Sequence, residues 1–254
     1  MCCIFENRNK RLMNLVIDVG NTRVKLAVFE VDRLINSFIS DEENFLQEIK
    51  KITQNYSIDY SILSSVREFS EKNKKRIKKI SSVLELSSET NVPFKNLYKT
   101  PKTLGKDRIA LVSAASKNFP NKNVLIIDAG TCITFDFLNS ENEYLGGAIS
   151  PGIQMRYKAL HHFTSKLPLV ALDFSDDFIG KTTDENINSG VLNGVIQEIN
   201  GVIYQYQNKY EDLTVVLTGG DAIFLSKQLK SSIFANQNFL LEGLNEILIF
   251  NKAE

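Results

Sequence analysis

The segment "LVIDVGNTRVKLAVF" (residues 15–29) returns later in the chain as "LIIDAGTCITFDFL" (residues 125–138). Each copy is an apolar stretch followed by Asp-x-Gly, a threonine and a second apolar stretch. Apolar and β-branched residues on both sides of a glycine break predict two strands joined by a tight turn. The repetition therefore predicts a chain built from two similar halves, each of which opens with such a hairpin.

Strands and helices alternate after each hairpin. In the first half a third strand precedes a helix, for which Asp41 is the expected N-cap and Phe45, Ile49 and Ile52 form the expected buried stripe. In the second half a third strand, "YLGGAISPG", is followed by helices, the longest expected at about 184–209. This order predicts the α/β class, with the same unit built twice.

The composition and net charge limit which classes of binding partner are expected. The 254 residues suit one large domain or two smaller ones, and 30 basic residues balance 30 acidic residues. A net charge of zero argues against broad electrostatic binding to nucleic acid or to a membrane surface. The basic run "EKNKKRIKK" at 71–79 contains Ile77, and therefore indicates the solvated face of a helix. No apolar run approaches the roughly 20 residues of a membrane span.

The cysteines and the first residues of the chain indicate the expected cellular compartment. Cys2, Cys3 and Cys132 are an odd number without a CxxC pair, which predicts neither a disulfide framework nor a zinc site. A reducing cytoplasm is the expected compartment. The chain begins with a very short apolar stretch followed by charged residues. A secretory signal has the reverse order and a longer apolar stretch. Because Met13 directly precedes the first strand, residues 1–12 are expected to be an N-terminal extension.

The two repeated turns carry the chemistry. Glycine lets the backbone approach an anion closely, and exposed amides at such a turn form an anion-binding nest. Asp18 and Asp128 could lie against a phosphate only with a cation between them, which favours Mg²⁺ or another hard cation. One such turn alone is common in β-hairpins, but two in matching contexts predict a polyphosphate held from both sides. "LTGGD" at 217–221, by itself also typical of a plain strand–helix turn, extends this prediction to a nucleotide.

The segment "LGKDR" at 104–108 is the predicted catalytic segment. It lies between the two repeats, at the expected start of a helix. Asp107 is also favoured there by the helix dipole alone, but in a kinase such a carboxylate orients the acceptor hydroxyl and takes its proton. The planar fork of Arg108 suits an acceptor that carries a carboxylate.

The ordered set of motifs resembles type III pantothenate kinase, a family of the superfamily that contains acetate and sugar kinases, heat-shock proteins and actin. The matching pieces are "DVGNTRVK", "YKTPKTLGKDR", "DAGTCITFD", "GGAISPG", "TTDENINSG" and "LTGGD". The resemblance implies a duplicated ribonuclease-H-like (actin-like ATPase) fold, with halves at 13–120 and 121–254 and the active site between them. It also implies ATP-dependent phosphorylation of pantothenate to 4'-phosphopantothenate, the first step of coenzyme A biosynthesis.

Individual roles follow from the same resemblance. Asp107 would be the proton acceptor, Asp18 would bind Mg²⁺, and Asp128 would hold a monovalent cation, K⁺ or NH₄⁺. The pantothenate contacts would be Tyr98, Gly105, Lys106, Asp107, Arg108 and Thr183. The ATP contacts would be Asp18, Val19, Gly20, Asn21, Thr22, Arg23, Val24, Lys25, Thr131, Gly219 and Gly220. Family members are homodimers, so a cytoplasmic homodimer is expected, without nucleic-acid or membrane partners.

One departure and two alternatives stay open. Lys106 stands where the family usually has a small or uncharged residue, which leaves the substrate affinity open. A different small-molecule kinase of the same superfamily is one alternative, although a sugar kinase would usually need a longer chain. A non-catalytic regulator of transcription is the other, since some relatives were first described that way. The presence of Asp18, Asp107, Arg108 and Asp128, together with the neutral net charge, argues against a regulator.

Overall fold

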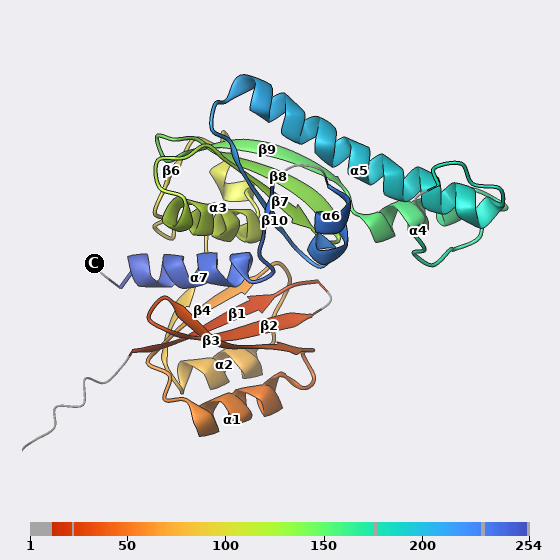
Figure 1. Cartoon of the computed structure of the whole chain (residues 1–254). Coiled ribbons are helices and arrows are strands. Elements are labelled where there is room, and N and C mark those ends of the chain that lie inside the picture. The colour runs from red at the N-terminus through yellow and green to blue at the C-terminus, as the bar shows by residue number, and fades with distance from the viewer. Residues whose placement is uncertain (1–11, 22, 175–176, 230–231, 253–254) are drawn as a thin grey trace, which may run out of the picture. The chain divides into compact units, whose positions relative to one another are not determined.

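Figure 1 presents the computed structural model of the chain, which describes residues 12–21, 23–174, 177–229 and 232–252. By their internal contacts these residues form two compact units. The first unit contains the chain up to Pro93, residues Lys102–Ala114 and the chain from Leu241 onward. The second unit contains Phe94–Pro101 and Ala115–Leu240. Each unit is thus assembled from separate stretches of the chain, and the sequence-based boundary between 120 and 121 stays a prediction.

The first unit contains a five-stranded sheet with the order β3-β2-β1-β4-β5. Its strands are β1 (Met13–Val19), β2 (Val24–Glu30), β3 (Arg33–Ser40), β4 (Tyr60–Ser65) and β5 (Ser82–Glu85). The first three strands form an antiparallel meander, β4 pairs in parallel with β1, and β5 pairs in parallel with β4. The predicted hairpin and third strand of the first half are confirmed.

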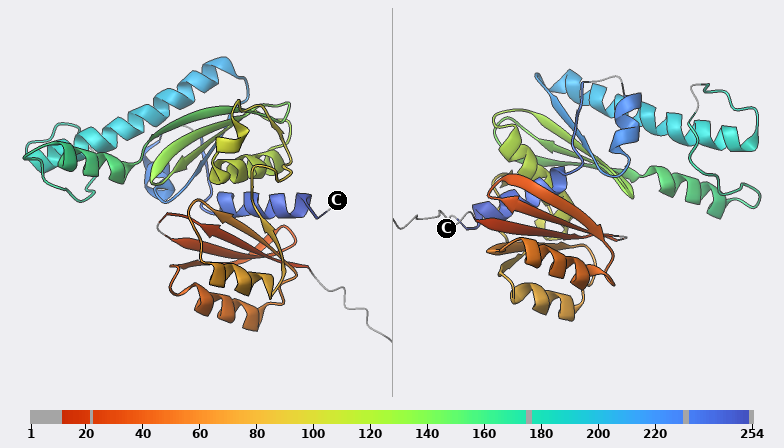
Figure 2. Two further views of the ribbon diagram at one scale, coloured as in Figure 1. Left: turned by 180° about the vertical axis from the view of Figure 1, so that it is seen from behind. Right: turned by 60° about the horizontal axis from the view of Figure 1, so that its bottom comes forward.

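Helices cover both faces of this sheet (Figure 1 and Figure 2). α1 (Phe45–Asn55) and α2 (Glu71–Lys78) lie on one face, and α7 (Phe239–Phe250) lies on the other, beside α3 (Lys106–Asn118). The predicted stripe of α1 is buried against the sheet. The predicted cap was wrong, because Asn44 occupies the N-cap position. Asp41 instead accepts a hydrogen bond from the Asn44 backbone N–H at 2.7 Å, one turn ahead of the helix.

The second unit contains a six-stranded sheet with the order β11-β10-β7-β8-β9-β6. Its strands are β6 (Lys95–Asn96), β7 (Val124–Ala129), β8 (Cys132–Leu138), β9 (Glu143–Pro151), β10 (Thr214–Thr218) and β11 (Phe234–Ala235). β7, β8 and β9 form an antiparallel meander, and β10 and β11 continue the sheet in parallel beyond β7. Five strands thus repeat the order and directions of the first sheet, which confirms the predicted duplication.

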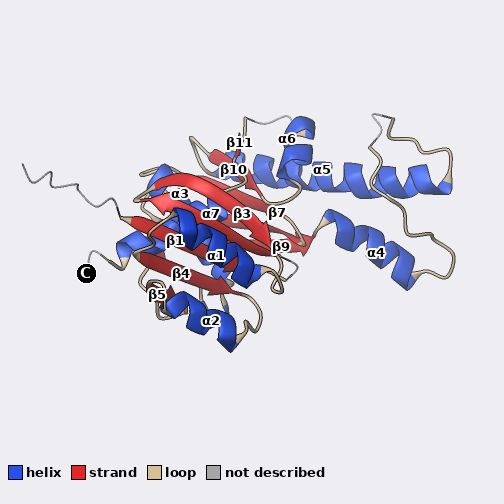
Figure 3. Cartoon of the chain, turned by 90° about the horizontal axis from the view of Figure 1, so that it is seen from below, coloured by secondary structure: helices blue, strands red, loops and turns tan. Residues whose placement is uncertain are grey.

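The helices of the second unit are α4 (Ile153–Phe163), α5 (Thr183–Lys209) and α6 (Ala222–Gln228), and a 3-10 turn at Pro101–Thr103 precedes α3. α5 has 27 residues and packs a row of buried aliphatic side chains on β7 and β8. Seen from below, its first part runs beside α4, away from the sheet (Figure 3). Among the helices in the described ranges, none is long and apolar enough to cross a membrane.

The two sheets place their aspartates at the same position. Asp18 is the next-to-last residue of β1 and lies opposite Lys25 of β2, and Asp128 is the next-to-last residue of β7 and lies opposite Thr134 of β8. Directly opposed residues of an antiparallel pair project from the same face of the sheet. The fold therefore gives each unit one carboxylate beside a turn. The first carboxylate has a cationic neighbour and the second has a hydroxyl neighbour.

Candidate active site

The pKa of the Asp18 carboxyl is strongly perturbed. Its side chain is 8% exposed, and burial raises its pKa to about 6. The positive charge of Lys25 opposes this shift, and the negative charge of Asp107 adds to it. Lys25 and Asp107 thus each lie within electrostatic reach of Asp18. A buried carboxyl that holds its proton up to about pH 6 is a position where a cation can take the place of that proton.

The turn after β1 is closed by its own backbone. The Gly20 N–H donates to the Arg23 carbonyl at 3.0 Å, and a Cβ atom on residue 20 would lie 3.3 Å from that oxygen. Asn21 and Arg23 are exposed, and Lys25 is half-buried. Thr22, also expected to contact ATP, lies outside the described residues. The turn therefore offers the polar side chains of Asn21 and Arg23 to solvent.

Two other residues of the predicted ATP set have a more limited role. Val19 and Val24 are fully buried in the core of the first unit, so only their backbone atoms can serve a ligand. Sequence reasoning missed Ser64, which pairs with Asp18 across β1 and β4. The buried Ser64 hydroxyl has no hydrogen-bond partner among the residues that the structure describes. An unsatisfied hydroxyl beside a buried carboxyl is suited to a water or a cation ligand.

The Asp107 carboxyl folds back over the start of α3. Its Oδ1 accepts a hydrogen bond from the Arg108 backbone N–H at 2.9 Å. A Cβ atom on Gly105 would lie only 2.3 Å from the same oxygen. Glycine is therefore required at 105 for this position of the Asp107 carboxyl. Arg108 itself is 5% exposed, so its guanidinium belongs to the buried part of the first unit.

The unusual Lys106 lies near a carboxylate of its own unit. A hydrogen bond from Lys78 is the main cause that lowers the pKa of Glu85, and the charge of Lys106 lowers it further. Glu85 already forms an ion pair with Lys78 at 2.7 Å, so Lys106 is only a weak partner of this carboxylate. The influence of Lys106 on substrate affinity therefore stays a prediction.

In the second unit, Asp128 lies against a glycine turn. Gly219 has a φ of +95°, and a Cβ atom there would lie 2.4 Å from Asp128 Oδ1 and 2.3 Å from the Ala129 carbonyl oxygen. Nothing lies within 4 Å of a Cβ on Gly220, which leaves open space over that residue. The buried Thr134 hydroxyl opposite Asp128 has no hydrogen-bond partner in the described part of the chain. A carboxylate and an unsatisfied hydroxyl on one face of the sheet fit an oxygen-coordinated cation.

The second repeated turn is held by the start of α4. Thr131 is exposed, and its carbonyl accepts a hydrogen bond from the Gly152 backbone N–H at 3.2 Å. A Cβ atom on Gly152 would lie 2.2 Å from the Gly130 carbonyl oxygen. The final glycine of "GGAISPG" is thus explained by close backbone packing. The turn keeps its shape while the Thr131 hydroxyl remains accessible.

The Tyr98 side chain packs against β9. Its ring stacks on Tyr144 with centroids 6.0 Å apart and an interplanar angle of 23°, and it borders Gly146, whose φ is +104°. The Tyr144 hydroxyl donates to Asp136 Oδ1 at 2.7 Å, and both side chains are fully buried. Sequence reasoning missed this supporting pair, because the contact depends on how β8 and β9 pair across their bulge.

Thr183 is the exposed first residue of α5, directly after a capping box. The Thr182 hydroxyl accepts from the Glu185 N–H at 3.2 Å, and Glu185 Oε2 accepts from the backbone N–H groups of Thr182 at 3.2 Å and Lys181 at 2.6 Å. The Thr-x-x-Glu spacing was the available sequence signal for this cap. It fixes the point at which α5 begins, and with it the position of Thr183.

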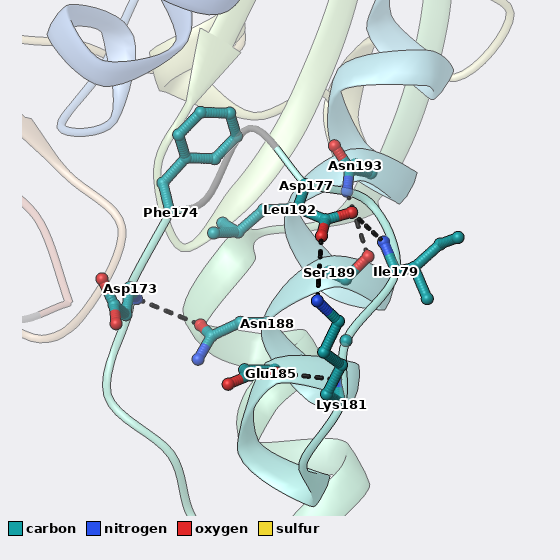
Figure 4. A pocket seen from close by; sticks show the side chains of 11 residues that line it. Asp173, Phe174, Asp177, Ile179, Lys181, Glu185, Asn188, Ser189, Leu192 and Asn193 are labelled. Carbon is teal, nitrogen blue, oxygen red and sulfur yellow. Dashed lines mark hydrogen bonds and ion pairs between the residues drawn. The ribbon is translucent and has the colours of Figure 1, made fainter.

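A polar pocket of about 230 Å³ lies beside this helix start (Figure 4). Asp177 accepts from the Ile179 N–H at 3.0 Å and lies 4.0 Å from Lys181 Nζ, while Asn188 Oδ1 accepts from the Asp173 N–H at 3.1 Å. In the close-up these groups point toward one another across the pocket (Figure 4). Asn188 thus attaches the preceding segment to α5, while the contacts of Asp177 lie within that segment.

An apolar groove of about 880 Å³ lies between α4 and α5. Its lining includes Leu160, Phe163, Ile187 and Val191, together with Thr183. Phe163 is 81% exposed, which is unusual for a large aromatic side chain. The groove therefore leaves a substantial apolar surface uncovered in the single chain.

The structure does not bring Tyr98 and Thr183 together. Tyr98 borders Gly146, and Gly146 lines a pocket of about 340 Å³ with Tyr206 near the end of α5. Thr183 begins the same helix, so roughly 35 Å of α5 separates it from Tyr206. Two predicted pantothenate contacts of the second unit thus lie near opposite ends of one helix.

Comparison with known proteins agrees with this arrangement of motifs. The family model of type III pantothenate kinase matches residues 14–205. The type III pantothenate kinase of Christiangramia forsetii is 51% identical over 243 residues, which cover 95% of this chain and 100% of the relative. The sequence-based resemblance is therefore confirmed.

Solved structures support the fold. The crystal structure of a conserved putative Baf family transcriptional activator from Campylobacter jejuni aligns with a TM-score of 0.61 at 23% identity, covering 94% of this chain and 100% of that chain. A putative N-acetylmannosamine kinase from Listeria monocytogenes aligns with a TM-score of 0.52 at 12% identity, covering 96% and 100%. At these identities the likeness concerns the duplicated actin-like fold alone. The family match over most of the sequence is what decides membership, and this chain belongs to the type III pantothenate kinase family.

Proposed function

We propose that Asp107 accepts the hydroxyl proton while this chain, a pantothenate kinase, phosphorylates pantothenate with ATP to form 4'-phosphopantothenate, the first step of coenzyme A biosynthesis. One observation carries the role of Asp107: its charge raises the pKa of Asp18, so the two carboxyl groups lie near each other in the first unit. A proton acceptor beside a cation-binding carboxylate is the pairing that phosphoryl transfer to an alcohol requires.

In the proposed step, the γ-phosphoryl group of ATP passes to the pantothenate hydroxyl. The hydroxyl proton passes to the Asp107 carboxylate as the hydroxyl oxygen forms a bond to the γ-phosphorus. The bond from that phosphorus to the bridging oxygen breaks, and ADP leaves. Since this chemistry is mostly positioning and charge neutralisation, one well-placed carboxylate is sufficient as the base. Gly105 contributes by leaving space for the Asp107 carboxyl.

A kinase of this fold uses ATP with a divalent cation, and we assign Mg²⁺ to Asp18. The buried carboxyl and the neighbouring Ser64 hydroxyl are oxygen donors of the kind that Mg²⁺ takes, directly or through water. Mg²⁺ keeps several waters and is commonly held by one or two carboxylates plus substrate phosphates. When bound, it would neutralise phosphate charge beside Lys25.

We propose ATP contacts along both repeated turns. In the first turn these are Asp18, Val19, Gly20, Asn21, Arg23, Val24 and Lys25, with the two valines contributing backbone only. Thr22 keeps its proposed role from the sequence alone. In the second unit the exposed Thr131 would contact phosphate, and the open backbone at Gly219 and Gly220 would lie against the nucleotide.

We propose that Asp128 holds a monovalent cation, K⁺ or NH₄⁺. Support comes from the carboxylate and the unsatisfied Thr134 hydroxyl on one face of β7 and β8. Both are hard oxygen donors. The assignment predicts higher activity in potassium or ammonium than in sodium at the same ionic strength.

For pantothenate we propose Tyr98, Gly105, Lys106, Arg108 and Thr183 as contacts, and a homodimer as the assembly. Support for the homodimer comes from the span of α5 between Tyr98 and Thr183, and from the uncovered apolar groove that contains Thr183. If both residues contact pantothenate, Thr183 has to reach the pocket of a second copy of the chain. We place the enzyme in the cytoplasm, as expected for reduced cysteines.

A coupled assay of ATP consumption tests the proposed function. The assay compares pantothenate with a panel of sugars as acceptors, in potassium and in sodium buffers. We expect turnover with pantothenate, little with sugars, and a marked preference for potassium. Turnover with a sugar alone would contradict the acceptor, and equal rates in both salts would contradict the cation site. Sedimentation of the wild type and of Phe163→Asp tests the homodimer, with dissociation expected for the variant.

A further inference from the structure

Arg67 holds the carbonyl group of the first phosphate turn. Its Nε donates to the Gly20 carbonyl oxygen at 3.0 Å, across a separation of 47 residues in sequence. The preceding residue, Val66, donates its backbone N–H to the Val19 carbonyl at 3.1 Å. Two successive carbonyls at the end of β1 are thus bound by two successive residues after β4. The first bond continues the sheet, and the second comes from a guanidinium.

Arg67 is itself oriented by Glu42. Its Nη1 lies 2.6 Å from Glu42 Oε2, while Glu42 Oε1 accepts from the Ser70 backbone N–H at 3.1 Å. The hydrogen bond from Arg67 is the largest cause that holds the pKa of Glu42 below its usual value. Both carboxylate oxygens are therefore engaged, and the planar guanidinium is held in one orientation.

We infer that Arg67, supported by Glu42, is a positioning residue for ATP binding at the first phosphate turn. The inference rests on the proposed role of that turn. A peptide group is planar and trans, so the carbonyl of Gly20 and the N–H of Asn21 point in opposite directions. A guanidinium on the carbonyl oxygen therefore fixes the direction of the Asn21 N–H. Without it, the flexible glycine allows this peptide group to rotate, and a carbonyl oxygen could face the phosphates.

The pair is suited to positioning more than to general stability. Arg67 and Glu42 are 32% and 31% exposed, and ion pairs with that much solvent contact contribute little to the free energy of unfolding. A fixed amide at an anion site, in contrast, acts directly on the bound phosphate. The loss of Arg67 is therefore expected to weaken ATP binding while the protein stays folded.

The test compares Arg67→Gln with the wild type in the coupled assay, with thermal unfolding measured alongside. We expect the KM for ATP to rise about tenfold, the order expected for the loss of one charge-assisted hydrogen bond. The KM for pantothenate and the melting temperature should stay close to wild type. Arg33→Gln is the matched control, because Arg33 forms an ion pair of the same 2.6 Å length with Glu30 of the same unit. It should leave both KM values unchanged.

Further variants keep the outcome decisive. Arg67→Lys keeps the charge but cannot make both contacts, and Glu42→Gln weakens the support, so each should raise the KM for ATP by a smaller factor. An unchanged KM for ATP in folded Arg67→Gln overturns the inference. If that variant does not fold, an unchanged KM in Glu42→Gln and Arg67→Lys overturns it instead. Lys25→Ala distinguishes failure of the role of Arg67 from failure of the proposed ATP site. If Lys25→Ala also leaves the KM for ATP unchanged, the assignment of the turn to ATP has failed.

Discussion

The carboxyl group of Asp107 occupies the space that a side chain on residue 105 would need, with Oδ1 2.3 Å from the position of a Cβ atom on Gly105. The obstructing atom is the end of a flexible side chain. Gly105→Ala should therefore fold, but with the Asp107 carboxyl displaced. We expect kcat to fall at least about tenfold, because displacing a catalytic group by about 1 Å can lower the rate a hundredfold.

Gly201→Ala is the matched control for this change. Nothing lies within 4 Å of a Cβ atom there, and the position is inside α5. It should raise the free energy of unfolding by up to about 1 kcal/mol and leave kcat unchanged. Equal kcat values in Gly105→Ala and the wild type would show that the position of the Asp107 carboxyl does not matter for the reaction.

The raised pKa of the buried Asp18 carboxyl predicts that the free energy of unfolding falls as the pH rises. Its folded pKa of about 6 exceeds the ordinary value of 3.8, so the folded state favours the protonated form. Ionising Asp18 then destabilises the metal-free fold. This effect is absent below about pH 4, grows between about pH 4 and pH 6, and levels off above pH 6 at about 3 kcal/mol. Because Asn cannot ionise, Asp18→Asn should be more stable than the wild type at pH 8 and equally stable near pH 4.

Urea unfolding in the presence of a chelator measures this difference at each pH. Asp32→Asn, at an exposed position of the same unit, controls for the loss of one negative charge. A stability difference between Asp18→Asn and the wild type that does not change with pH would contradict the burial of an ionisable carboxyl. Added Mg²⁺ should raise the stability of the wild type more than that of Asp18→Asn.

The sequence predicted the repeated elements well, because their signals are local. The strand–turn–strand pattern around Asp18 and Asp128 located both hairpins, and the expected helix beginning near residue 184 begins at Thr183. The two-residue strands β6 and β11 went unpredicted, since a pattern so short has no periodicity. The cap at Asp41 was wrong because Asn44, three residues later, is the N-cap and the helix begins at Phe45.

The parts of the candidate site that sequence reasoning missed depend on contacts between distant residues. Arg67 meets Gly20 only because β4 pairs with β1 in one particular register. Ser64 and Thr134 become notable only once burial leaves their hydroxyls without partners among the described residues. Neither register nor burial of a single polar residue can be read from local composition.

The support beneath Tyr98 gives a prediction for pantothenate. Tyr144→Phe removes the hydroxyl that donates to Asp136 at 2.7 Å but keeps the ring on which Tyr98 stacks. Removing the hydrogen bond to this buried carboxyl should lower the free energy of unfolding by about 1–3 kcal/mol. If Tyr98 contacts pantothenate, the KM for pantothenate should also rise, with the KM for ATP unchanged. A shift in the KM for ATP alone would argue against Tyr98 as a pantothenate contact.

The role of Asp107 is the central claim, and Asp107→Asn tests it most directly. Asn keeps the size and the hydrogen-bonding capacity of the side chain but cannot accept the hydroxyl proton. In the coupled assay with ATP, pantothenate and potassium, we expect kcat to fall at least about a hundredfold, the lower end for removal of a general base. The melting temperature and the KM for ATP should stay near wild type. Undiminished turnover in Asp107→Asn would contradict the account.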